Sequence, residues 1–212
     1  MFNNDKRKAE EIEEIFREVK RKQRPISDLA SSILLASFSC GEALKPHIHA
    51  QTQKENTALY PALCYEFIFF FSHLMNRDAL SILGSDGRIK LQSEISPLIV
   101  IPAISGFFEH WPEDIKEKMG NHFYDDLNDA ELDYSSCRGL LLPSPEVLIK
   151  ELFEHPTSFS DNTLFTKLIS RLINLSGNTL SHEAILLLLE ISVKTLTNLN
   201  LKKQIEEIKK IL

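Results

Sequence analysis

The chain has 212 residues, of which 43% are hydrophobic and 25% are charged, and this length favours one domain spanning 1–212. Its net charge of −6 argues against a general nucleic-acid-binding protein, because phosphate contacts require a basic surface. Seven glycines and nine prolines are too few for a turn-rich β-sandwich, and Leu, Ile, Glu and Lys favour helix. We therefore expect an all-α protein, a compact bundle of about seven to nine helices.

Several features indicate a reduced, cytoplasmic protein. The first residues, MFNNDKRKAEEIEE, contain no apolar segment of a secretory signal. The three cysteines form no CxxC motif, so neither a zinc ribbon nor a redox pair is indicated. The longest apolar run is interrupted by Glu66 and His73 and is short for a membrane span. We expect no membrane or nucleic-acid partner, no metal and no cofactor.

A charged helix is predicted at about residues 5–22. Its apolar positions have i, i+3, i+4, i+7 spacing, which makes a narrow stripe that docks on one neighbour. Arg24-Pro25 should end this helix, because the residue before a proline avoids the α conformation. The stretch 1–24 holds eight basic and six acidic residues, a net charge of +2. The apolar positions are Ile12, Ile15, Phe16 and Val19.

A second helix should follow Ser27, a typical N-cap residue. Its sequence, DLASSILLASFSC, is rich in Ala and Ser, and such small residues allow neighbouring helices to approach closely. His47 and His49 lie in the connection that follows. Two alternatives remain open for this pair, which are capture of a metal ion and exposure as ordinary loop histidines.

The central element is predicted at Tyr60–Leu83. This stretch is apolar on nearly every side, so the other helices must surround it. It should begin near Tyr60, because Pro61 is tolerated only in the first turn. The sequence Gly-Ser-Asp-Gly at 84–87 should end it.

The middle of the chain is predicted to contain two further helices. Ser96-Pro97 resembles a helix start, which another short helix can precede, and Pro102 either kinks the helix or starts a new turn. A second start lies at Pro112, and residues 128–138 are too irregular for more than a loop or a frayed end. The expected buried edge of this second helix is Ile115, Met119, Phe123 and Leu127.

Three helices are expected in the C-terminal third. The first begins at Ser144 and the second is capped by Asp161 and stopped at Gly177, with Leu and Phe at i, i+4 spacing. The third begins at Ser181 and continues to Leu212, with a fully apolar and therefore buried middle. Its tail, about 199–212, has a narrow apolar stripe like that of the N-terminal helix. The two stripes pack on each other, or one of them meets a second copy of the chain.

Glu66, His73 and Arg77 fall in one polar stripe of the central helix, and this stripe is the best candidate for a functional site. In one interpretation it lines the solvent edge of the helix. In another it is buried and satisfied by a facing helix, with Glu94 or Glu109 as the partner of Arg77. In a third it lines a pocket for a polar or anionic ligand. The ligand-binding candidates are then Glu66, His73, Arg77 and His110, with Trp111 beside them.

Sequence motifs of catalysis are absent. The chain has no HExxH, GxSxG or glycine-rich phosphate loop, and no ExxH pairs of a di-iron bundle. Glu66 and His73 are about 10.5 Å apart along a helix axis, too far to be adjacent ligands of one ion without further residues. Nine acids and two lysines lie between Glu109 and Asp133, which indicates a solvated face or a site for a cation or a basic partner.

These observations favour a protein-interaction or scaffold module that acts through helix faces, as a homo-oligomer or with a protein partner. The alternative is a small-ligand-binding protein or an enzyme that uses Glu66, His73 and Arg77, with or without a metal ion.

Overall fold

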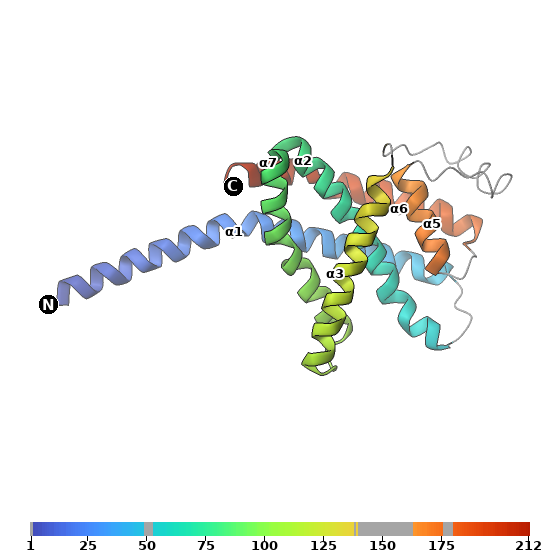
Figure 1. Ribbon diagram of the computed structural model, residues 1–212, viewed down its shortest axis with the longest axis horizontal. Helices are drawn as coiled ribbons and strands as arrows, with labels where there is room; N and C mark the ends of the chain where they lie inside the picture. Colours follow the sequence, from blue (N-terminus) through green and yellow to red (C-terminus); the bar gives the residue numbers. More distant parts are fainter. Residues whose placement is uncertain (1, 49–52, 138, 140–162, 176–179) are drawn as a thin grey trace.

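The computed structural model describes residues 2–48, 53–137, 139, 163–175 and 180–212 (Figure 1). Side chains are described from Gln23 onwards in the first helix and from Leu59 onwards in the second. These residues form six α-helices and one 3-10 helix, and their only β interaction is a single bridge between Gly139 and Thr163. The all-α class is therefore confirmed for this part of the chain. The helix start at Ser144, the cap at Asp161 and the stop at Gly177 lie outside the described residues.

Helix α1, Phe2–Leu44, is continuous through Pro25, so the predicted end at this proline is wrong. Pro25 costs the helix one backbone hydrogen bond, but burial of the residues just after it outweighs this loss. Ile26 and Leu29 expose only 3% and 0% of their surface. The short helix η1, Lys45–His47, follows and contains His47; residue 49 lies outside the described residues.

Helix α2, Gln53–Phe107, consists of two helical arms joined at Gly84. Gly84 has φ 75° and ψ −176°, and the chain turns there so that the second arm runs back along the molecule (Figure 1). The predicted turn is thus confirmed, although only Gly84, and not all four residues 84–87, leaves the helical conformation. The predicted helix starts near Tyr60 and at Ser96 are wrong, because Pro61, Pro97 and Pro102 all lie inside α2.

The first arm of α2 is the centre of the packed core, as expected for Tyr60–Leu83. Every residue from Glu66 to Asn76 is buried. Helix α1 packs closely on this arm, since a Cβ atom on Gly41 would lie 2.6 Å from the Cys64 sulfur. The close approach that we expected of the small-residue helix is therefore present at this point.

Helices α3, Glu113–Ser135, and α5, Leu164–Leu175, pack beside α2. Pro112 is the N-cap of α3, and Phe123 lies on its buried side as predicted. Of the two alternatives for 128–138, a loop or a frayed helix end, the loop is wrong as far as Ser135, because the buried residues Ala130 and Tyr134 continue the apolar edge and extend the helix. The buried residues of α5 match the predicted i, i+4 pattern and include Leu164, Phe165, Leu168, Ile169 and Leu172.

Helices α6, His182–Leu199, and α7, Leu201–Lys209, complete the described chain. Ser181 caps α6 as predicted, and its hydroxyl accepts a hydrogen bond from the Ala184 N–H. The expected uninterrupted helix is wrong, because Asn200 adopts the left-handed conformation with φ 43°. Helix α7 packs chiefly on α2 and also contacts α1, so its stripe is occupied within the chain. The buried stripe is Leu201, Ile205 and Ile208.

One stretch, Glu183–Lys209, is long and apolar enough to meet the length and composition criteria of a membrane span. Core helices of soluble proteins meet the same criteria. Here the stretch contains the Asn200 break, and Leu188 and Ile205 within it are fully buried against the other helices.

Candidate functional site

The structure places the four candidate residues in three separate environments. Glu66 and His73 are buried, with 7% and 2% of their surface exposed, and they face α3 and α5. Arg77, one turn further along α2, is exposed, and His110 is exposed in the connection between α2 and α3. Within the described part of the chain no hydrogen bond or ion pair joins any two of these four residues.

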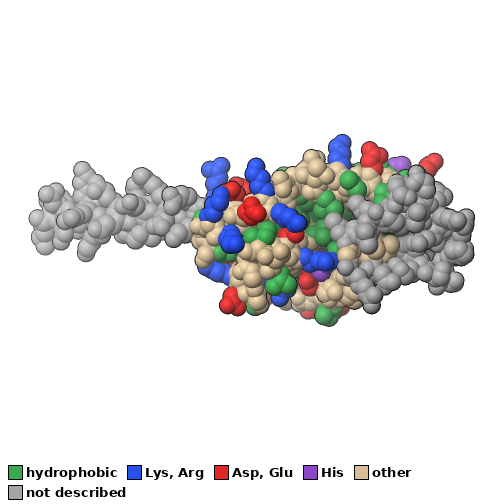
Figure 2. Space-filling model, turned by 90° about the horizontal axis from the view of Figure 1, so that it is seen from above, with side chains coloured by type: hydrophobic (Ala, Val, Ile, Leu, Met, Phe, Trp, Pro, Cys, Tyr) green, Lys and Arg blue, Asp and Glu red, His purple; other side chains and the backbone are tan. Residues whose placement is uncertain are grey.

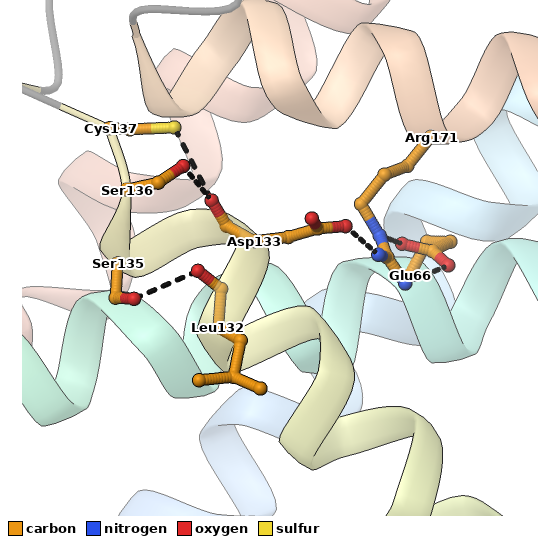
Figure 3. A network of polar contacts seen from close by, with 7 residues as sticks. All are labelled: Glu66, Leu132, Asp133, Ser135, Ser136, Cys137 and Arg171. Carbon is orange, nitrogen blue, oxygen red and sulfur yellow. Dashed lines mark hydrogen bonds and ion pairs between the residues drawn. The ribbon is translucent and has the colours of Figure 1, made fainter.

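Arg171 of α5 is the partner of Glu66. Its Nε donates a hydrogen bond of 2.6 Å to Glu66 Oε2, and its Nη2 donates one of 3.0 Å to Oε1 (Figure 3). The remaining Nη1 donates a hydrogen bond of 2.7 Å to Asp133 Oδ2. One guanidinium thereby connects three helices, α2, α3 and α5, in the fork geometry that suits carboxylates.

The last turn of α3 holds Asp133 in place. Helix-terminal carbonyls lack partners within the helix, and side chains supply them here. The Ser136 hydroxyl and the Cys137 thiol both donate to the Asp133 carbonyl, at 2.7 and 3.8 Å (Figure 3). The Ser135 hydroxyl donates to the Leu132 carbonyl at 2.8 Å. The Asp133 carboxylate is thus positioned toward Arg171 by an anchored helix end.

Burial dominates the electrostatics of this cluster. It raises the pKa of Glu66, and the hydrogen bonds and charge of Arg171 only partly oppose it. Burial also disfavours the charged form of Arg171, but Glu66 more than compensates, so the pKa of the guanidinium is raised. The ring of Tyr134 lies 5.8 Å from this guanidinium. Its hydroxyl stays neutral, because complete burial raises its pKa well above 10.0.

A second polar cluster surrounds His73. The Nδ1 atom of its ring lies 2.9 Å from Glu131 Oε2 on α3, and because a carboxylate only accepts, Nδ1 carries the proton. The amide of Asn76 donates to the same oxygen at 3.5 Å. The imidazole also lies 5.5 Å from the ring of Tyr134, between the two clusters. His73 therefore fixes α2 against α3 rather than facing solvent.

A small cavity of about 20 Å³ lies next to Asn76 and Glu131. The Asn76 Oδ1 and the hydroxyl of Ser72, another residue lining it, are buried without a hydrogen-bond partner in the described structure. This volume suits one water molecule, which is the usual partner of such groups.

Arg77 lies apart from both clusters, at a groove of about 410 Å³ between α2, α5 and the junction of α6 with α7. Glu94 and Glu109 are exposed, and the described residues show no ion pair between either of them and Arg77. Glu66 and His73 are thus buried and satisfied by facing helices, through partners for which we had made no prediction. Arg77 instead lines a solvent-accessible groove, and the partners predicted for it, Glu94 and Glu109, do not pair with it in the described structure.

The acidic run between Glu109 and Asp133 divides in the same way. Glu131 and Asp133 belong to the two clusters, whereas the other seven acids, from Glu109 to Asp129, are exposed to solvent. The partners of Glu66 and His73 were missed because nothing near them in sequence points to them. One signal existed for Arg171, since it and Lys167 are the only charged residues of α5.

The clusters show no arrangement typical of catalysis. Across the described residues no three His, Cys, Asp or Glu side chains are grouped so that they could hold a metal ion. Burial raises the pKa of the Cys64 thiol to about 12, so it is not a thiolate at neutral pH. Comparisons of the chain with protein families, with curated proteins and with solved structures found no match.

Proposed function

We propose that the chain is a helix-mediated interaction module that self-associates through the N-terminal half of α1. Figure 1 shows this half extending away from the packed helices, with no other helix drawn alongside it. The single observation that supports the proposal is that the buried face of α1 continues, at the same spacing, into the extending half.

The continuity is visible at seven-residue intervals. Ile26, Ile33 and Cys40 expose only 3%, 0% and 1% of their surface in the packed half. Val19 and Ile12 precede them at the same interval. A second row at the same interval contains the buried Ala30 and, further back, Phe16 and Ala9, and it is interrupted by the polar, exposed Gln23. Two apolar rows with a seven-residue repeat are typical of a helix that pairs with another helix.

A partner helix also explains why this half is helical. Most helix stability in proteins comes from packing an apolar face on a neighbour rather than from helix propensity. No described helix supplies such packing to residues 2–22 in Figure 1. A second helix laid along the two rows would supply it.

We take the partner to be a second copy of this chain in parallel orientation. We call the contact along the two rows the seam. In a parallel pair, a residue beside the seam in one copy faces the residue five positions later in the other copy, so Lys8 would face Glu13. The next such pair, Ile15 with Lys20, brings no like charges together. An antiparallel pair that overlaps over the full stretch 6–22 would oppose Lys8 to Lys22 and Glu13 to Glu13, which repel. Charge thus favours the parallel dimer.

Light scattering after size exclusion, over a range of concentrations, tests the proposal. A dimer should have twice the chain mass of 24.2 kDa. The double variant Ile12→Lys/Val19→Lys should be monomeric, because it buries two charges in the seam. The matched control Glu14→Lys/Arg21→Lys changes the net charge equally on the opposite side of the helix and should stay dimeric. A monomeric wild type, or a dimeric seam variant, would refute the proposal. Cytoplasmic location and the absence of a nucleic-acid partner remain predictions.

A further inference from the structure

The groove beside Arg77 has an apolar wall and a basic edge. It is formed where the first arm of α2 meets the start of α5 and the α6–α7 junction, and its volume is about 410 Å³. Small-molecule sites commonly have volumes in the range of about 300–1,000 Å³. Figure 2 shows hydrophobic side chains gathered in the middle of one face of the molecule, with Lys and Arg side chains at their edge. The lining residues with apolar side chains are Leu74, Leu164, Leu196 and Leu201.

Two cations border this groove. Arg77 and Lys202 are both exposed, and neither makes a hydrogen bond or ion pair with any residue that the structure describes. They belong to different helices, α2 and α7, and line the same groove as the half-buried Asp78. Burial raises the pKa of Asp78, and the charges of Lys202 and Arg77 partly oppose this rise. The groove thus carries two cations against one acid.

We infer that this groove binds a small amphiphilic carboxylate, with the carboxylate held by Arg77 and Lys202 and the hydrocarbon chain against the leucines. An arginine presents paired N–H donors that match the two oxygens of a carboxylate. Leu74, Leu164 and Leu201 expose at most 8% of their surface, so the hydrocarbon chain would rest on the apolar atoms that reach the groove wall, including those of the half-buried Leu196. A purely polar anion would leave these apolar atoms in contact with water, and a neutral hydrocarbon would leave the cations without a partner.

This site goes beyond the proposed self-association and is independent of it. The groove involves α2, α5, α6 and α7, whereas the association surface lies on residues 2–22 of α1. Failure of either proposal leaves the other standing, because the Ile12→Lys/Val19→Lys variant should still bind the ligand.

Isothermal titration calorimetry of the full chain with decanoate, below its micellar concentration, tests the inference. Decanoate should bind to one site. Butanoate has the same head group on a chain six carbons shorter, and decan-1-ol has a ten-carbon chain without the charge. Each should bind at least about tenfold more weakly than decanoate. Equal binding of decanoate and either analogue, or no binding of decanoate, would overturn the inference.

Variants then locate the site. Arg77→Gln/Lys202→Gln should weaken decanoate binding by at least about tenfold. The control Lys203→Gln/Lys209→Gln removes the same charge from exposed positions of α7 that do not line the groove, and its affinity should match wild type. An unchanged affinity in the groove variant would place decanoate elsewhere. Flotation with phosphatidylglycerol vesicles separates a lipid surface from a dissolved ligand. We expect the wild-type protein not to float. If it floats and the variant Arg77→Gln/Lys202→Gln does not, the ligand of the groove is a membrane lipid rather than a dissolved carboxylate.

Discussion

Arg171 on α5 and Glu66 on α2, 105 residues apart in the sequence, form a buried ion pair through two hydrogen bonds of 2.6 and 3.0 Å. Removing either charge from water is costly, and the pair recovers this cost only while both members are present. Asp133 and Tyr134 surround the guanidinium and complete its environment. The pair therefore adds little net stability, but it penalises any packing of α5 on α2 that separates its two charges.

Replacing Arg171 with Met should destabilise the protein strongly. The change keeps much of the side-chain volume but leaves the Glu66 carboxylate buried without its cation. We expect the free energy of unfolding to fall by about 3–5 kcal/mol near neutral pH, as measured by urea denaturation. Arg24→Met is the control, because Arg24 is exposed and its contact with Asp28 is 3.8 Å long; it should change stability by less than about 0.5 kcal/mol. Similar small losses in both variants would contradict this penalty.

The pH dependence of Glu66→Gln should reveal the raised pKa of Glu66. A carboxyl with a higher pKa in the folded protein than its ordinary value of 4.5 binds protons more tightly when folded. Its stabilising contribution is present below pH 4.5 and is lost as the pH rises through the folded value. Relative to wild type, Glu66→Gln should therefore gain stability in urea titrations as the pH rises above 4.5 and through the folded pKa of Glu66. A relative loss with rising pH would mean that Arg171 outweighs burial.

The two candidate histidines should respond differently to truncation. His73→Ala removes the hydrogen bond to Glu131 and opens a cavity beside Tyr134, so the free energy of unfolding should fall by about 2–4 kcal/mol. His110→Ala, at an exposed position, should change it by less than about 0.5 kcal/mol. Thermal or urea unfolding followed by circular dichroism measures both. Equal effects would refute the buried role of His73.

Gly84 should be intolerant of a side chain. Its φ of 75° and ψ of −176° belong to a region that glycine alone occupies readily, although a methyl group added there would meet no other atom within 4 Å. The cost of Gly84→Ala is then backbone strain of about 1–3 kcal/mol. Gly106 is helical with equally open surroundings, so Gly106→Ala should leave stability unchanged or raise it by up to about 1 kcal/mol. Urea denaturation of both variants measures the difference. A tolerated Gly84→Ala would show that the two arms can turn in another way.

Asp78→Asn should strengthen decanoate binding. The substitution removes the one acid of the groove and keeps the shape of the side chain, so the field of Arg77 and Lys202 acts on the ligand alone. We expect the affinity measured by calorimetry to rise by about threefold or more at low salt. A weaker affinity would indicate that Asp78 holds Arg77 or Lys202 in its binding position.

Local patterns in the sequence were sufficient for the helical class and for the central position of Tyr60–Leu83. They also identified the buried face of α5 and the Ser181 cap, which is observed with its hydrogen bond to Ala184. These features depend on residues three or four positions apart, so the local sequence is sufficient to predict them. Helix ends at prolines were misplaced, because burial of Ile26 and its neighbours outweighs the single hydrogen bond that Pro25 removes.

The sequence by itself determined that Glu66, His73 and Arg77 share one stripe of a central helix. Only the tertiary structure decided that Arg171 satisfies Glu66, that Glu131 satisfies His73 and that Arg77 borders an open groove. The partners come from α3 and α5, 58 and 105 residues further along the chain. A helical period fixes the side of the helix on which a charge lies, but the charge opposite it depends on how distant helices pack.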